Sequence, residues 1–487
     1  MKKYKVFFIL FGIVAALSIV AAIVLSSDSI SFKRSSGNEE TTVEGENAGD
    51  IAQLGNEIIP EEPEPEPEPE PVFEEYDIHI MALGDNLYHT GVINSGKKSD
   101  GTLNYDHEYT EILDFLELAD IKIINQETPL AGNDRGFSSY PVFNTPTEVG
   151  DATAKAGFNV VLGATNHAFD QGTSGLVSFY NFYKEKYPEI LICGIHGDTP
   201  PSILPNTVVG EEGVNMVLTT AGTASDVDPD EEANSVILDD ANDYHRINLI
   251  KIQGLTFAIL NYSYGNNTET FSSAQEKLMD SLSLWDPSSR RYNFEEMNPQ
   301  VLDDIKLAET IADITIVCPH WGVEYQTTPS PLQKKWGEQM VEAGADVIIG
   351  AHPHVPQPIE WISAENGNEA ICYYSLGNYV STQNQASVNM LEEMAWVTIH
   401  VAEDGAYVSK PDTGVIPLVN HYTFNPLSYQ HTYLLEDYTA DMAASHGILG
   451  WGGFALKLDT LLDLKEQIMG DNVLTRQDVY NQFDKAE

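Results

Sequence analysis

The feature that most constrains the fold is an alternation, from Tyr76 onward, between short apolar runs and stretches with helical spacing. Short apolar runs bounded by turn-forming residues are typical of buried strands. The alternation therefore predicts an α/β fold with strands covered on both faces, and antiparallel members of a mixed sheet remain open. The expected strands are 78–83, 121–124, 160–162, 256–260, 314–317, 347–349 and 371–374, and the expected helices are 107–119, 147–156, 299–310 and 331–343.

Polar side chains follow five of the expected strands, at the point where each strand ends. In α/β sheets, functional groups gather outside the carboxyl ends of the strands. We therefore expect two carboxylates, an amide and four imidazoles to lie around one crevice. These residues are Asp85, Glu127, Asn166, His167, His320, His352 and His354.

The types of these side chains favour metal chemistry. Mixed oxygen and imidazole ligands suit a pair of divalent cations, which lower the pKa of a bound water and neutralise a phosphoryl oxygen. Each residue also has an ordinary explanation, since Gly84-Asp85 is a common turn and Asn166-His167 a common loop cap. The joint placement at five strand ends favours the metal site.

The N-terminus predicts a membrane anchor. Lys2, Lys3 and Lys5 precede an apolar run from Val6 to Leu25, about the 20 residues that a helix needs to cross the hydrocarbon. The lysines favour a cytoplasmic segment at 1–5, a single-pass signal anchor in the cell membrane at 6–26, and an extracellular remainder. A cleaved signal peptide is the alternative.

The charge and cysteine content exclude some classes of partner. The chain has 74 acidic and 25 basic residues and a net charge of −49, which repels a phosphate backbone, so we expect no nucleic-acid partner. Three scattered cysteines are too few for a disulfide framework or a thiolate metal cluster and are interpreted as buried thiols. Residues 27–75 include a Glu-Pro tract and are expected to form a disordered acidic spacer, because like charges repel and proline stiffens the chain.

Six ordered motifs, over roughly residues 76–385, resemble those of the CapA family of capsule-synthesis proteins. The resemblance implies a role in poly-gamma-glutamate capsule biosynthesis and export, with an N-terminal membrane segment. It also implies a fold similar to calcineurin-like metallophosphatases, with layered mixed sheets flanked by helices. The motifs are Gly84-Asp85, Asn125–Leu130, Ala164–Gly172, His320–Tyr325, Gly350–Glu360 and Tyr374–Val380.

The same resemblance implies roles for single residues. His167 would be the catalytic general acid or the donor to a phosphoryl oxygen. The cofactor would be two divalent ions, with Mn, Fe and Zn not distinguished. Asp85 and His354 would hold the first ion, Asn166, His320 and His352 the second, and Glu127 would bridge them.

At two positions the sequence lacks a histidine that would be a potential metal ligand. Leu87 stands where dinuclear phosphatases usually have a His, so the first metal position is weakly held or empty. Ala351 stands where another His is frequent in the capsule family.

Four further residues are candidates for substrate binding or for support of the ligands. Trp321 either forms a flat wall of the crevice or packs against the sheet. Glu324 is a candidate acceptor behind the ligands, and Asn378 is expected in a turn beneath the metals. Asp170 either orients His167 or caps a helix.

The remaining chain, 386–487, is expected to be a C-terminal extension that either packs on the core or meets a partner. It is expected to have one strand near 394–401 and a mainly helical tail from Asp437. Two functional classes stay open. One is a metal-dependent hydrolase that acts outside the membrane on a phosphoester or on the anionic polymer. The other is a non-catalytic subunit that binds metal and polymer within a capsule polymer-synthesis complex.

Overall fold

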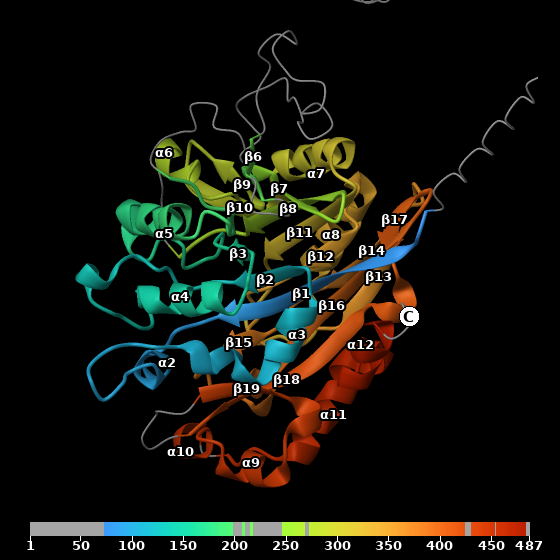
Figure 1. Cartoon of the computed structure of the whole chain (residues 1–487). Coiled ribbons are helices and arrows are strands. Elements are labelled where there is room, and N and C mark those ends of the chain that lie inside the picture. Colours follow the sequence, from blue (N-terminus) through green and yellow to red (C-terminus); the bar gives the residue numbers. More distant parts are fainter. Residues whose placement is uncertain are drawn as a thin grey trace, which may run out of the picture. The chain divides into compact units, whose positions relative to one another are not determined.

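In the computed structural model, described residues form two mixed sheets with helices on their outer faces (Figure 1). The described residues are 73–197, 207–209, 215–217, 246–267, 272–423, 430–452 and 454–483. Among them, nine strands form the first sheet. In spatial order its main path is β19 (Gln430–Leu434), β18 (Gly414–Tyr422), β16 (Leu391–Ala402), β1 (Tyr76–Asn86), β2 (Ile121–Asn125), β3 (Val160–Leu162) and β4 (Leu191–Cys193), with β15 (Asn378–Val380) beside β1 and β17 (Gly405–Val408) beside β16.

The second sheet has eight strands within the described residues. Its order is β13 (Ile359–Ser363), β14 (Glu369–Tyr373), β12 (Val347–Ile349), β11 (Ile314–His320), β8 (Leu255–Ser263), β7 (Asn248–Ile252), β5 (Thr207–Val209) and β6 (Asn215–Val217). A separate hairpin joins β9 (Ser283–Asp286) to β10 (Arg291–Met297). β1 to β4 are parallel to one another, as are β8, β11, β12 and β14. The α/β class and all seven expected strands are therefore confirmed, and the antiparallel members left open are present in both sheets.

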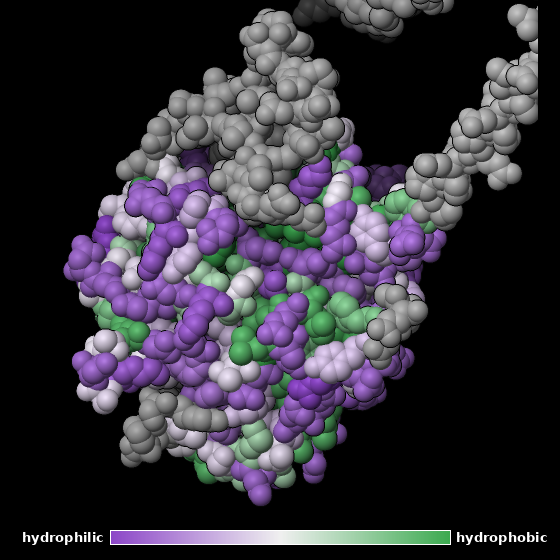
Figure 2. Space-filling model, viewed as in Figure 1, coloured by the Kyte–Doolittle hydropathy of each residue, from purple (hydrophilic) through white to green (hydrophobic). Residues whose placement is uncertain are grey.

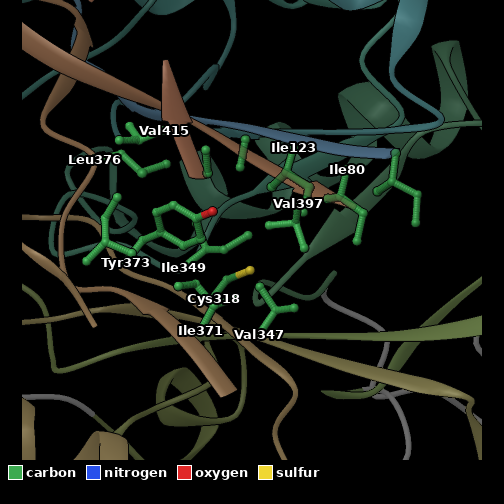
Figure 3. Close-up of a cluster of buried hydrophobic side chains, with 14 of the residues drawn as sticks. Ile80, Ile123, Cys318, Val347, Ile349, Ile371, Tyr373, Leu376, Val397 and Val415 are labelled. Atoms are coloured by element: carbon green, nitrogen blue, oxygen red, sulfur yellow. The ribbon is translucent and has the colours of Figure 1, made fainter. Parts of the chain in front are cut away.

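The two sheets face each other across an apolar core. Ile80 and Ile123 of the first sheet meet Val347 and Ile371 of the second, and Cys318 lies among them (Figure 3). All three cysteines are buried free thiols, as expected. Helices cover the outer faces, so that a continuous apolar run is buried on both sides of each central strand. The first sheet carries α2 (Thr90–Ser95), α3 (Leu113–Leu118), α4 (Thr147–Lys155) and α5 (Gly172–Lys186), and the second carries α7 (Pro299–Ile311) and α8 (Pro331–Ala343). The short α6 (Ser273–Glu276) buries none of its residues, and its Gln275 Nε2 donates to Thr173 Oγ1 of α5 at 3.2 Å.

Local sequence signals explain why the helices begin where they do. In α8 the Ser330 hydroxyl accepts from the Gln333 backbone while the Gln333 side chain accepts from the Ser330 backbone, and Pro331 occupies the first turn. Gly344, with φ of 123°, ends the helix. The expected helix at 107–119 is corrected, since a 3₁₀ helix, η1 (Asp106–Ile112), precedes the short α3.

The chain beyond residue 385 packs on the core, which is the first of the two alternatives considered for it. β16 pairs with β1 along eight registered positions, from Tyr76↔Val401 to Leu83↔Met394. Residues 71–487 form one compact unit. The expected helical tail is present as α9 (Ala440–Ser445), α10 (Leu449–Gly452), α11 (Leu458–Met469) and α12 (Arg476–Phe483), and it packs on the sheet, where Trp396 Nε1 donates to Gln482 Oε1 at 3.0 Å.

The expected anchor at 6–26 and most of the spacer at 27–75 lie outside the described residues. Within the described part, no helix has the length and apolar character that a membrane crossing requires. Hydrophilic side chains cover much of the face seen in Figure 2, in keeping with the acidic composition.

A close backbone contact joins β1 to the segment before β15. A Cβ on Gly84 would lie 2.0 Å from the carbonyl oxygen of Gly377, and the next residue, Asp85, donates its N–H to that same oxygen at 2.9 Å. Only glycine fits here without moving one backbone away from the other. The contact therefore sets the position of Asp85.

We expect Gly84→Ala to lower the free energy of unfolding by more than about 2 kcal/mol, because the clash is with backbone. The matched control is Gly367→Ala, which has φ of +96° and open space around the added methyl and should lose only the roughly 1–2 kcal/mol of a Cβ at positive φ. Urea unfolding of both variants measures the difference. Equal losses would show that the contact at Gly84 is not tight.

Candidate metal centre

The carboxyl ends of both sheets converge on one buried cluster. Asp85 lies near the end of β1, and Glu127 and Asn166 follow β2 and β3. His320 ends β11, and the loop after β12 carries His352 and His354. The structure thus brings together side chains that the sequence separates by up to 269 positions.

Asp85 is the common partner of this cluster. Its carboxylate accepts from Asn125 Nδ2 at 2.7 Å and from the backbone N–H of His352 at 3.3 Å, and its Oδ2 lies 3.0 Å from His354 Nδ1. The Asp85 side chain is fully buried. A single carboxylate therefore joins three elements of two sheets.

Two groups of potential ligands share Glu127. Asp85, Glu127 and His354 form one group, and Glu127, His320 and His352 form the other, with the ligand atoms of each group within 4.8 Å of one another. Asn166 belongs beside the second group, because its Oδ1 lies 3.0 Å from His320 Nε2. All six residues are buried. The arrangement would allow one ion to bind on each side of the Glu127 carboxylate.

The unpaired polar atoms of the cluster fit a metal ion. Among the described residues, both carboxylate oxygens of Glu127 and the Nδ1 atoms of His320 and His352 are buried without a hydrogen-bond partner. Buried polar atoms without partners are costly and uncommon in native proteins. A divalent cation satisfies carboxylate oxygens and imidazole nitrogens together, so the donor set fits one.

The pKa shifts in the cluster follow from burial and charge. Burial, reinforced by neighbouring histidines, lowers the pKa of both His320 and His352 well below 6.5, which leaves neutral imidazoles, the form that ligates metals. Burial also lowers the pKa of His354, but Glu127 and Asp85 outweigh it and raise the value to about 9. Burial raises the pKa of Glu127. In the metal-free protein, the His354 imidazolium therefore takes the position of a cation between two carboxylates.

The loop that carries the two histidines is strained. His352 has φ of 99° and His354 has φ of 59°, a region that residues with a Cβ seldom occupy. The bond from the His352 N–H to Asp85 and the contact of His354 with Asp85 hold the loop in this conformation. Such strain clusters at functional sites, where the surroundings over-determine the backbone.

His167 lies at the edge of the cluster with a fixed orientation. Its Nδ1 lies 2.8 Å from Asp170 Oδ2, and its Nε2 lies 4.0 Å from Glu127 Oε1. Asp170 also accepts the backbone N–H of Phe143 at 2.7 Å. Gln171 is the residue that precedes α5 at its N-cap. Of the two roles considered for Asp170, the structure therefore supports orientation of His167.

The other supporting candidates have different outcomes. Trp321 does not form a crevice wall, because its side chain is fully buried, stacks on Tyr374 and donates Nε1–H to the Tyr374 carbonyl at 3.0 Å. Glu324 is exposed, with a carboxylate oxygen within 4.8 Å of nitrogen atoms of His352 and His354. Asn378 Oδ1 lies 3.0 Å from His354 Nδ1 beneath the cluster.

The sequence reasoning missed three residues around the cluster. The Tyr264 ring lies 4.7 Å from that of His352, and Asn267 Nδ2 lies 3.2 Å from His167 Nδ1. Both residues follow the expected strand at 256–260. The tendency of functional groups to lie after the carboxyl ends of strands would have identified them if that strand end had been considered. His89, four residues after Asp85, lines a cleft beside the cluster. Leu87, at the position where a His is usual, is buried.

Comparison with known proteins identifies the family of the chain. A family model described as "Bacterial capsule synthesis protein PGA_cap" matches residues 79–236 and 237–383, which is more than half of the chain. The chain belongs to this family. "Capsule biosynthesis protein CapA" of Bacillus anthracis is 38% identical over 127 residues, and "PGA biosynthesis protein CapA" of Bacillus subtilis (strain 168) is 39% identical over 101 residues.

The matched stretches are short relative to these two relatives. They cover 25% of this chain and 28% of the Bacillus anthracis protein, and 21% of this chain and 24% of the Bacillus subtilis protein. The resemblance to the capsule family drawn from six motifs is confirmed by the family match. The roles of single residues stay predictions.

We expect the affinity for Mn²⁺ to rise by up to about tenfold per pH unit between roughly pH 6.5 and 9, because the ion must displace the His354 proton. The sign follows from a pKa raised to about 9 in the folded protein. The ion pair stabilises the metal-free fold at lower pH, and this contribution is lost as pH rises through about 9. Calorimetric titration at several pH values measures the dependence.

The matched variants are His354→Gln, which should flatten the pH dependence, and His400→Gln. His400 lies on β16 and contacts Asp77 rather than the cluster, so its variant should behave as wild type. Affinity that does not change with pH in the wild-type protein would contradict the assignment of the proton to His354.

Proposed function

We propose that the protein is a membrane-anchored extracellular capsule-synthesis protein, whose metal centre acts as a phosphoesterase-like site in poly-gamma-glutamate biosynthesis or export. Membership of the capsule family and the printed names of the two relatives support the process. The lysines before an apolar run support the anchor. The process, the anchor and the reaction are separate parts of the proposal.

One observation carries the reaction. Glu127 belongs to both ligand groups, and its two carboxylate oxygens are buried without partners within the described residues. This favours a dinuclear centre of the kind seen in metallophosphatases, held by Asp85 and His354 on one side of Glu127 and by Asn166, His320 and His352 on the other. Such ions supply Lewis-acid stabilisation to a phosphoryl oxygen.

The residues of the chain around the centre would supply orientation and proton transfer. His167, held by Asp170 at 2.8 Å, can donate a proton from Nε2 to the leaving oxygen or a hydrogen bond to a phosphoryl oxygen. Buried walls around Glu127 and His320 exclude water and strengthen these interactions. Glu324 at the exposed edge can approach His352 and His354.

The test is hydrolysis of bis(p-nitrophenyl) phosphate by the full chain loaded with Mn²⁺. We expect His352→Ala to lower kcat/KM by about 100-fold or more, the loss typical of a damaged metal site, and to lower the metal content measured by mass spectrometry. His400→Ala, which alters a histidine outside the cluster, should match wild type. Activity that is equal in wild type and His352→Ala would refute the phosphoesterase site.

The alternative is a non-catalytic subunit that binds metal and polymer within a capsule polymer-synthesis complex at the membrane. The observation that favours it is Leu87, which is buried where dinuclear phosphatases usually place a ligand. Metal bound without turnover of any ester or gamma-glutamyl peptide would support this role.

For this alternative we expect binding of poly-gamma-glutamate to require divalent cation. The chain and the polymer are both strongly anionic, so they repel each other unless an ion neutralises the contact. Sedimentation with labelled polymer, with and without EDTA, measures the effect. Binding that is unchanged after complete metal removal would contradict it.

A further inference from the structure

An open cleft of about 900 Å³ lies directly beside the ligand cluster. His167 and His354 form part of its wall, so the cleft and the candidate metal centre share a boundary. A volume of this size accommodates a group much larger than a phosphate. The residues that line the cleft therefore determine which chemical group can bind next to the group that reacts at the metal centre.

The lining of the cleft, all of which is described, contains neither lysine nor arginine. The internal stretches outside the described residues, 198–206, 210–214, 218–245, 268–271 and 424–429, contain no Lys or Arg either. Charge in the lining is negative, from Asp170 and Glu324.

Each imidazole of the lining either faces a carboxylate or is neutral. His167 Nδ1 lies 2.8 Å from Asp170 Oδ2. His354 faces the carboxylates of Asp85 and Glu127, at 3.0 Å and 3.6 Å. Burial, with His354 and His167 nearby, lowers the pKa of His89 to about 4. A polymer with one carboxylate per residue would be repelled along the cleft.

Neutral donors and acceptors replace charge on the walls. Gln383, Asn384, Gln385 and Asn267 contribute side-chain amides, and Ser139 contributes a hydroxyl. Each amide offers both donor and acceptor atoms, which is what hydroxyl groups and acetamido groups of a ligand require.

One of these amides is fixed to the metal centre. Gln383 Oε1 accepts from Asn378 Nδ2 at 2.9 Å, and Gln383 Nε2 donates to the Tyr325 hydroxyl at 3.1 Å. Asn378 in turn contacts His354 at 3.0 Å. A ligand that forms a hydrogen bond with Gln383 or Tyr325 would thus have a fixed position relative to the metal-ligand cluster.

Two tyrosine rings line the cleft. Tyr140, on the loop before Phe143, is 74% exposed, and Tyr325 lies on the loop after β11. The Tyr325 N–H donates to the Pro353 carbonyl at 2.7 Å, which ties this loop to the histidine loop. Exposed rings beside amides present flat apolar faces together with hydrogen-bonding groups, and sugar rings have the same combination.

We propose that this cleft binds a neutral glycosyl group. In the proposed function, the glycosyl group would be the part of a phosphoester substrate that lies beside the metal centre. Only this placement of the group rests on the proposed function. The phosphoryl charge would meet the cluster, and the sugar would meet Tyr140, Tyr325 and the amides.

The test uses the full chain in EDTA, in a detergent without sugar headgroups, with N,N′-diacetylchitobiose as the neutral probe and tri-γ-glutamate as the anionic probe. Saturation-transfer NMR titration measures the Kd of each. We expect chitobiose binding that is insensitive to salt between roughly 0.05 and 0.5 M, and no tighter binding of tri-γ-glutamate.

Matched variants separate the cleft from the rest of the surface. Tyr140→Ala should weaken chitobiose binding about fivefold through loss of ring stacking. Tyr407→Ala is the control, because Tyr407 is 56% exposed on β17 beside His400 and should leave binding unchanged. Asn384→Lys adds a cation to the wall and should create salt-sensitive binding of tri-γ-glutamate.

Two results would overturn the proposal. One is the lack of any chitobiose signal from the wild-type protein at roughly 20 mM, well above the Kd of a weak specific site. The other is tighter binding of tri-γ-glutamate than of chitobiose, lost in Tyr140→Ala. Because EDTA removes turnover from the experiment, failure of the phosphoesterase test with chitobiose binding intact would refute the proposed reaction alone.

Discussion

The buried carboxylate of Asp85 is the interaction on which the site depends. It accepts from Asn125 at the end of β2 and from the backbone of His352 after β12, and it contacts His354. The Asp85 backbone also donates to Gly377, before β15. A buried carboxylate is stable only when such partners compensate for its lost hydration. The same bonds that compensate the charge therefore draw the two sheets together at their carboxyl ends.

Charge compensation also explains how the metal-free and metal-bound states can share one fold. Asp85 and Glu127 place two carboxylates in a space without bulk water, and His354 with a pKa raised to about 9 supplies a matching proton. A divalent ion would replace that proton and satisfy the unpaired atoms of Glu127, His320 and His352. Beside this centre, the cleft is lined by amide and aromatic side chains in addition to a few charged ones. In our two proposals, phosphoryl chemistry and binding of a neutral group would therefore fall to adjacent but different sets of residues.

Much of the fold was predictable because its signals are local. The strands at 160–162 and 347–349 and the helix at 331–343 were found at the expected bounds, since continuous apolar runs and a capping box act within a few residues. Trp321 was ambiguous because an aromatic residue after a strand packs or lines a site according to its tertiary neighbours, here Tyr374. The strands β18 and β19 were missed, because the pairing of β18 with β16 and of β19 with β18 is a long-range property.

By itself the sequence determined the α/β class, the capsule family and the residue types available to a metal, because these depend on local pattern and on motif order. Tertiary structure alone decided that Glu127 lies in both ligand groups and that His89, Tyr325 and Gln383 line one cleft. Those placements depend on how two sheets pack face to face. Residues far apart along the chain meet there because the apolar faces between the sheets must be buried together, and spacing along the chain does not encode that distance.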